Sequence, residues 1–333
     1  MNENTVEPGS IGCSGGAAAV VGRFAPTPSG RMHLGNVYAS LIAWLSARSA
    51  GGRVVLRVED LDPRTQSGPW TELLLDDLRW LGLAWDGEPV YQHDRLELYR
   101  EAARELDATG LTYPCFCTRA ELHAASAPHA SDGTPVYAGT CRDLSPEEVA
   151  ARSRVRPPAL RLRVPDASDP AGAIAFTDRV YGEQRQVLAR ACGDFLVRRS
   201  DGVFAYQLAV VVDDAEMGVT EVVRGCDLLP STPRQIYLQR LLELSQPSYA
   251  HVPLLLAPDR RRLAKRDHDL DMGELRERFG SPAPLLGWLA GATGLAPDTA
   301  PRTADELAAS FSWDAVRAHR ENHVISAEAL PIA

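Results

Sequence analysis

The chain of 333 residues lacks the features that define several protein classes. No apolar run approaches the roughly 20 residues needed to cross a bilayer. The N-terminal stretch carries Glu3 and Glu7 and lacks the basic start of a secretory signal. Six cysteines are too few for a disulfide scaffold in a chain of this length. We therefore expect a cytoplasmic protein with no membrane association.

A surplus of positive charge is also missing, since the formal net charge is −9. This value argues against broad, non-specific binding to nucleic acid, although it leaves room for a local basic surface. The 45% of hydrophobic residues is ordinary for a globular protein, and the length allows a large core and two compact units.

Short apolar runs alternate with helical patterns in the first third of the chain. Residues 20–25 and 53–58 are typical of buried strands, and residues 37–49, 70–81 and 94–109 have helical periodicity. This alternation predicts an α/β fold in which a parallel sheet is covered by helices.

The pattern breaks after residue 112 into Pro-, Ser- and Ala-rich loops that end in an alternating strand at 160–164. Residues 194–197 and 202–213 suggest a hairpin-like pair of strands, and 231–244 a helix. Candidate helices follow near 274–278, 284–290, 304–310 and 312–321. We divide the chain into a flexible tail (1–18), the first half of a catalytic domain (19–112), an insertion (113–165), the second half (166–270) and a helical C-terminal region (271–333).

The segment GRFAPTPSGRMHLGN (22–36) runs from a predicted strand into a helix. A helix N-terminus presents free backbone N–H groups, which suit an anionic ligand such as a phosphate. Gly35 allows a close approach to the backbone, and His33 can donate a hydrogen bond to a phosphate.

A second segment, RLAKR (262–266), is basic. A mobile lysine such as Lys265 is a suitable point charge for phosphates that gain negative charge in a reaction. Taken alone, this segment is more typical of a solvated basic loop.

Three cysteines, Cys115, Cys117 and Cys141, have the spacing of metal ligands. Zinc takes four ligands in a tetrahedron and favours thiolates. The residues leave the fourth ligand open between His123, His129 and Tyr137. Tyr137 would have to lose a proton with a usual pKa of about 10, which a dication makes possible.

Two further segments, RVEDLD (57–62) and AYQLAVVVDDAEMGVTEVVRG (205–225), complete a resemblance to a known family. The chain resembles the class I aminoacyl-tRNA synthetases in their glutamate-specific form, from about residue 21 to residue 274. In this comparison residues 33–36 match the first ATP-binding motif of the family, which is usually His-Ile-Gly-His. Asn36 stands where that motif has its second histidine. Residues 262–266 match the second motif, with Arg262 and Ala264 as departures and Lys265 retained.

The resemblance implies a Rossmann-like catalytic domain that contains a zinc-binding insertion. It also implies that ATP, accompanied by Mg²⁺, contacts His33, Gly35, Asn36 and Lys265, of which His33 and Lys265 are catalytic. Glu59 would hold the ammonium of L-glutamate, and a bidentate arginine would distinguish its side-chain carboxylate from the amide of glutamine. The implied glutamate-binding residues are Arg23, Phe24, Ala25, Pro26, Thr27, Glu59, Tyr206 and Arg224.

Only 67 residues follow Arg266 (333 minus 266), which is short for the helical anticodon-binding domain of a full-length glutamate enzyme. Together with the pattern Cys-x-Cys…Tyr-x-x-x-Cys, this points to the truncated branch of the family. The branch implies one Zn²⁺ on Cys115, Cys117, Tyr137 and Cys141, and transfer of glutamate to queuosine in the anticodon of tRNA(Asp). We expect a monomer. Two alternatives stay open: a truncated enzyme that charges the 3′ end of tRNA(Glu), and a non-catalytic zinc-containing RNA-binding module.

Overall fold

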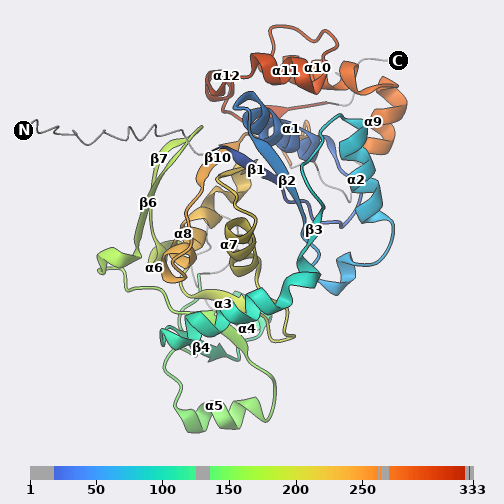
Figure 1. Ribbon diagram of the computed structural model, residues 1–333. Helices are drawn as coiled ribbons and strands as arrows, with labels where there is room; N and C mark the ends of the chain where they lie inside the picture. The colour runs from blue at the N-terminus through green and yellow to red at the C-terminus, as the bar shows by residue number, and fades with distance from the viewer. Residues whose placement is uncertain (1–18, 125–135, 262, 264–269, 327–329, 331–333) are drawn as a thin grey trace, which may run out of the picture.

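The computed structural model describes residues 19–124, 136–261, 263, 270–326 and 330 (Figure 1). The predicted tail at 1–18 lies outside these residues, as do Arg262, Lys265, Arg266 and His129. Within the described part of the chain, no helix is long and apolar enough to cross a membrane.

Two groups of strands form the centre of the molecule. One is a parallel sheet in the order β1-β2-β3, and the other has the order β7-β6-β10-β9. They meet at β1 and β9, because the Thr220 amide donates to the Val21 carbonyl at 3.0 Å. All pairs are parallel except β6 with β7, so the predicted parallel sheet gains an antiparallel edge. The strands are β1 Val21–Phe24, β2 Arg53–Val58, β3 Val90–Tyr91, β6 Ala173–Asp178, β7 Gly182–Val187, β9 Glu221–Gly225 and β10 Ser248–Val252.

Helices cover this sheet at the places that the periodicity predicts. Helix α1 (Leu34–Ser49) buries a continuous face between Leu34 and Ala47 against the sheet, and α2 (Trp70–Trp80) packs into the same core. Helices α3 (Leu96–Ala108), α7 (Tyr206–Glu216) and α8 (Thr232–Leu241) enclose a second core with β6 and β9.

The prediction of a strand over residues 202–213 is wrong. The strand β8 (Phe195–Arg198) is present, but the next element is helix α7, which begins at Tyr206. A short, continuous apolar run does not distinguish a buried strand from a buried helix by periodicity. Here the run is buried on nearly all sides, so no polar face marks the helical period.

The insertion forms a separate antiparallel sheet in the order β4-β5-β8, which lies at the bottom of Figure 1. The insertion contributes β4 (Thr112–Cys115), α4 (Arg119–Ala124), α5 (Pro146–Ser153) and β5 (Ala159–Leu162). The third strand, β8, comes later in the chain, and α6 (Leu188–Ala191) lies between β7 and β8. Its small core gathers Tyr113, Cys115, Phe116, Tyr137 and Cys141.

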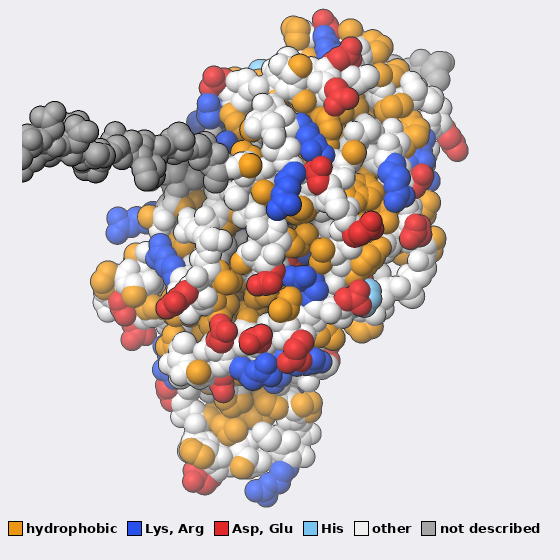
Figure 2. All heavy atoms as spheres, viewed as in Figure 1, with side chains coloured by type: hydrophobic (Ala, Val, Ile, Leu, Met, Phe, Trp, Pro, Cys, Tyr) orange, Lys and Arg blue, Asp and Glu red, His pale blue; other side chains and the backbone are white. Residues whose placement is uncertain are grey.

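The C-terminal region is helical, as predicted, and lies at the opposite end of the molecule (Figure 1). One element was not predicted: β12 (His323–Val324) pairs with β11 (Leu255–Leu256) and returns the chain to the catalytic domain. The helices are α9 Met272–Phe279, α10 Pro282–Ala292, α11 Ala304–Ser310 and α12 Trp313–Ala318. Acidic and basic side chains are interspersed over the face in Figure 2, which does not favour non-specific binding of a polyanion.

Candidate functional site

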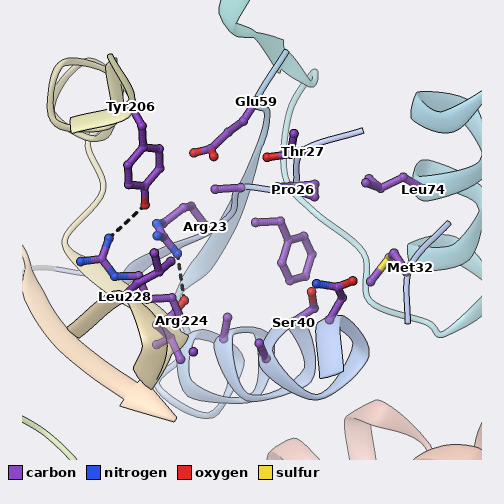
Figure 3. A pocket seen from close by; sticks show the side chains of 17 residues that line it. Arg23, Pro26, Thr27, Met32, Ser40, Glu59, Leu74, Tyr206, Arg224 and Leu228 are labelled. Atoms are coloured by element: carbon purple, nitrogen blue, oxygen red, sulfur yellow. Dashed lines mark hydrogen bonds between the residues drawn. The ribbon is translucent and has the colours of Figure 1, made fainter. Parts of the chain in front are cut away.

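A cavity of about 420 Å³ opens at the carboxyl ends of β1, β2 and β9 (Figure 3). This edge is where open parallel sheets bind ligands, because the strand ends and the following loops converge there. The N-terminal half of α1 contributes Asn36 and Ser40 to the lining. Met32 and Leu74 form an apolar wall. Nine of the predicted site residues line the cavity: Arg23, Phe24, Ala25, Pro26, Thr27, Asn36, Glu59, Tyr206 and Arg224.

Arg224, at the end of β9, is buried and held on several sides by hydrogen bonds. Its Nη2 donates to Thr232 Oγ1 at 2.9 Å and to Gln235 Oε1 at 2.8 Å. Its Nη1 donates to the Tyr206 hydroxyl at 3.3 Å, on the side that faces the cavity (Figure 3). The guanidinium is therefore fixed in orientation before any ligand arrives.

The remaining edge of the Arg224 guanidinium contacts His251, a fully buried residue of β10. Arg224 Nε donates to His251 Nε2 at 3.0 Å, and His251 Nδ1 lies 2.6 Å from Asp178 Oδ2. Burial and the neighbouring Arg224 lower the pKa of His251 to about 4, against the opposing effect of Asp178. The imidazole is consequently neutral, with its proton on Nδ1 and an acceptor facing Arg224.

Arg23 and Glu59 approach the cavity from β1 and from the end of β2. Arg23 Nη1 donates to the Val223 carbonyl at 2.9 Å, which ties β1 to β9. Burial raises the pKa of Glu59, and the charges of Arg57 and Arg23 only partly offset this effect. An ammonium ion in the cavity would favour the charged form of Glu59.

Arg57 lies behind Glu59 and is completely buried. Its guanidinium contacts Glu59 Oε1 at 3.1 Å, Asp214 Oδ1 at 2.6 Å and Asp213 Oδ2 at 3.6 Å. Burial lowers the pKa of Arg57, but these carboxylates, Asp214 foremost, raise it overall above its ordinary value. Asp213 also accepts from Gln92, Arg95 and Tyr99, so the layer that supports Glu59 reaches α3.

The start of α1 is built from three of the predicted residues. His33 is the N-cap, and its Nδ1 accepts from the Gly35 amide at 3.1 Å, while Asn36 Oδ1 accepts from the His33 amide at 3.2 Å. A Cβ at position 35 would lie 3.0 Å from His33 Cε1. Gly35 therefore leaves room for the His33 ring, a reason the sequence did not suggest. His33 and Gly35 flank the cavity without lining it.

The chain from Leu270 to Met272 runs beside this helix start. Leu34 donates to the Leu270 carbonyl at 3.0 Å, and Met272 donates to the Met32 carbonyl at 2.8 Å. A buried Asp77 adds ion pairs to Arg31 at 3.3 Å and to Arg276 at 2.9 Å. Lys265 itself lies outside the described residues, but the chain from Leu270 onward is anchored next to the first motif.

The insertion brings together four potential ligand atoms. The three sulfurs of Cys115, Cys117 and Cys141 lie within 4.8 Å of one another. The Tyr137 hydroxyl is 3.5 Å from Cys115 Sγ and 3.6 Å from Cys117 Sγ, and Cys117 Sγ is 3.6 Å from Cys141 Sγ. A tetrahedral zinc with Zn–S bonds of about 2.3 Å and a Zn–O bond of about 2.0 Å would separate its ligands by roughly 3.5–3.8 Å. The donor set therefore fits this metal.

Arg161 and Gly193 hold Tyr137 in this position. The Arg161 guanidinium lies 3.9 Å from the centre of the Tyr137 ring, and its Nε donates to Cys115 Sγ at 3.2 Å. Gly193 pairs with Tyr137, and a Cβ there would lie 2.7 Å from the Tyr137 carbonyl oxygen. Of the two histidine alternatives, His129 and the side chain of His123 lie outside the described part of the chain.

Sequence reasoning missed much of the layer behind the cavity. Arg57, Asp213 and Asp214 stand inside the two segments that carry the resemblance, yet only Glu59, Tyr206 and Arg224 were singled out. These three charged residues stand within apolar runs. A charged residue in a buried strand or helix is unusual unless its charge is paired, so this pattern could have indicated buried ion pairs. Gln235 and His251 carried no comparable signal.

The chain is similar to known proteins over most of its length. Residues 19–298 match the family model described as tRNA synthetases class I (E and Q), catalytic domain. The chain is 50% identical over 322 residues to a glutamyl-Q tRNA(Asp) synthetase of Symbiobacterium thermophilum, covering 93% of this chain and 97% of that protein. It is 48% identical over 291 residues to the protein of that name from Nitratidesulfovibrio vulgaris (84% and 88% covered). A glutamate-tRNA synthetase structure from Elizabethkingia anophelis matches with a TM-score of 0.78 at 26% identity, covering 93% of this chain and 68% of that one.

Proposed function

The chain belongs to the class I tRNA synthetases of the glutamate and glutamine type and is thus a ligase, and we propose that it attaches L-glutamate to queuosine in the anticodon of tRNA(Asp). In the first step ATP activates glutamate as the adenylate. In the second step a hydroxyl of queuosine takes the glutamyl group. The queuosine step rests on the names of the relatives, whereas the glutamate step also rests on the cavity.

The observation that carries the glutamate step is the charge pattern of the cavity lining. Two cations, Arg23 and Arg224, and one anion, Glu59, are the charged residues that line it in the described part of the chain. Glutamate offers the complement: two carboxylates and one ammonium. Glutamine would leave one of the two cations without an anionic partner.

In this proposal each group holds one part of glutamate. Arg224, steadied by Tyr206, receives the side-chain carboxylate, and Glu59 receives the ammonium. Arg23 completes the carboxylate-binding side, and the residues at 24–27 shape the wall of the cavity. These contacts place the α-carboxylate for in-line attack on the α-phosphorus of ATP, so catalysis consists mainly of positioning and charge stabilisation.

We assign ATP to the start of α1. His33, Gly35 and Asn36 form the helix N-terminus there, where the positive end of the helix dipole favours phosphates. Lys265 would stabilise the charge that develops on the pyrophosphate. Mg²⁺ accompanies ATP and neutralises its phosphate oxygens.

We also propose one structural Zn²⁺ held by Cys115, Cys117, Cys141 and Tyr137. Four protein ligands leave no open position, which is typical of a structural rather than a catalytic site. The metal would fix the insertion, whose small core is otherwise built from few residues.

Glutamate-dependent ATP–pyrophosphate exchange in the absence of tRNA tests the first step. We expect exchange with L-glutamate and none with L-glutamine at equal concentration. Zinc-loaded, folded protein that gives no exchange at millimolar glutamate would exclude the enzymatic proposal and favour an RNA-binding module without catalysis.

Transfer of radiolabelled glutamate tests the second step. We expect label on tRNA(Asp) that carries queuosine and none on queuosine-free tRNA(Asp). The similarity to solved glutamate-tRNA synthetases supports one rival, which charges the 3′ end of tRNA(Glu). Label that appears on intact tRNA(Glu), but not on tRNA(Glu) whose 3′ end was oxidised with periodate before the reaction, would establish that rival instead.

A further inference from the structure

Arg224 differs from the other buried arginines of the pocket in the charge of its partners. Its hydrogen bonds go to Tyr206, Thr232, Gln235 and His251, all of which are neutral. Among the described residues, no carboxylate forms an ion pair with its guanidinium. We call these four partners the neutral cage.

The two neighbouring arginines, in contrast, each have a carboxylate beside them. Arg57 contacts Asp214 at 2.6 Å and Glu59 at 3.1 Å, and Arg23 has Asp214 at 3.8 Å. The carboxylate of Asp178 lies on the far side of the His251 imidazole from Arg224, bonded to the other ring nitrogen. Arg224 therefore carries its charge, inside the protein, without direct compensation.

A buried cation without an adjacent anion is unfavourable, and an anionic ligand relieves this cost. Neutral acceptors fix the orientation of the guanidinium but leave its charge available to a ligand. We propose that the neutral cage determines the preference for glutamate over glutamine, with Gln235 as its key positioning residue. This inference rests on the proposed function and deepens it.

The geometry around Gln235 explains its part. Its Oε1 accepts from Arg224 Nη2 at 2.8 Å, while its Nε2 donates to Gln207 Oε1 at 2.9 Å. Gln207 in turn donates to Ser231, which orients the whole chain of amides. A carboxylate at position 235 would keep the shape and the hydrogen bond to Arg224. It would also supply the anion that the ligand otherwise provides.

The substitution Gln235→Glu tests this role, because it changes charge at almost constant volume. We expect glutamate affinity to fall by about 30-fold or more, which is the loss typical when a buried charge pair is disrupted. Binding of L-glutamine should change much less, so the preference for glutamate over glutamine should drop at least tenfold. Isothermal titration calorimetry with each amino acid measures both, and the KM for ATP in the exchange assay should stay within about twofold.

Two matched variants separate charge from shape. Gln246→Glu adds the same charge at an exposed position and should leave the preference unchanged. Gln235→Met removes the acceptor without adding charge, and it should weaken both amino acids to a similar degree. Should Gln235→Glu not fold, Gln207→Glu places the charge one hydrogen bond further from Arg224 and should give a smaller effect of the same sign.

The inference is overturned if folded Gln235→Glu keeps the glutamate preference of the unsubstituted protein within twofold. It is also overturned if Gln235→Met lowers that preference as much as Gln235→Glu does. An unsubstituted protein that fails to bind glutamate at all would instead refute the proposed function.

Discussion

The side chains of Arg224 and His251 meet edge to edge, with Nε and Nε2 3.0 Å apart and both residues buried. Because the arginine can only donate, the histidine must accept and must be neutral. The Asp178 carboxylate keeps the single imidazole proton on the opposite nitrogen. A histidine thus orients the arginine of the proposed glutamate pocket without contributing charge.

This neutral histidine predicts a pH dependence of stability. The pKa of His251 is about 4 in the folded protein, below the ordinary 6.5, so the unfolded chain binds the proton more readily. Its contribution is fully present above pH 6.5 and is lost as the pH falls toward 4. The free energy of unfolding should decrease by up to about 3 kcal/mol over this range. Urea unfolding at several pH values measures it, and His251→Gln should show a shallower slope.

Arg224→Gln removes a charge-assisted contact and leaves a carboxylate of glutamate poorly paired. We expect glutamate affinity to fall by about 2–5 kcal/mol, roughly 30- to several-thousand-fold. The KM for ATP should change little, because Arg224 lies outside both ATP-binding motifs. The exchange assay measures both constants. A change in glutamate affinity within about twofold would mean that the substrate pocket has been placed wrongly.

Lys265→Ala should produce the reverse pattern. Its charge is expected to act on the pyrophosphate as it develops, so the rate of adenylate formation should fall while glutamate affinity stays nearly constant. Single-turnover adenylation and glutamate titration measure the two quantities. Weaker glutamate binding with an unchanged rate would contradict the assignment.

Cys117→Ser should lose most of the bound zinc. Metal binding and local folding depend on each other in a structural site, so removing one ligand weakens both. Tyr137→Phe should weaken zinc retention, whereas His129→Ala should not. Metal analysis after dialysis against a chelator measures retention. Cys226→Ser, outside the cluster, is the control and should retain the metal.

Arg57→Met removes the cation shared by three carboxylates. Breaking a buried ion pair from one side typically costs about 3–5 kcal/mol, and here Glu59, Asp213 and Asp214 would all be affected. Chemical denaturation should show a loss of this size. Arg64→Met, at a largely exposed arginine, should change stability little, and equal losses in the two variants would speak against a special role for Arg57.

The sequence predicts the elements around the site better than the contacts within it. The helices at 70–81 and 304–310 have a clear polar face, and the strands at 20–25 and 53–58 are short apolar runs bounded by turn residues, so local rules suffice. Helix α7 escaped these rules because it is buried on nearly all sides.

The cavity residues were predicted because each stands within a contiguous motif. The resemblance located Arg23, Glu59, Tyr206 and Arg224, and the fold brings all four to one cavity. Gln235 and His251 act through Arg224, from α8 and β10, and they belong to no motif. Their role depends on three-dimensional neighbours, which a local sequence pattern does not specify.

The hydrogen bond from Arg23 to the Val223 carbonyl has a consequence for protein synthesis. It joins residues 200 positions apart, and ribosomes add roughly 5–20 residues per second. About 10–40 s therefore pass between the synthesis of Arg23, on one side of the pocket, and the synthesis of Val223, on the other side. During that interval β1 has β2 as a partner but lacks β9, so one edge of the young sheet is exposed. A nascent chain shorter than about 252 residues, the end of β10, cannot yet bind glutamate in the proposed pocket.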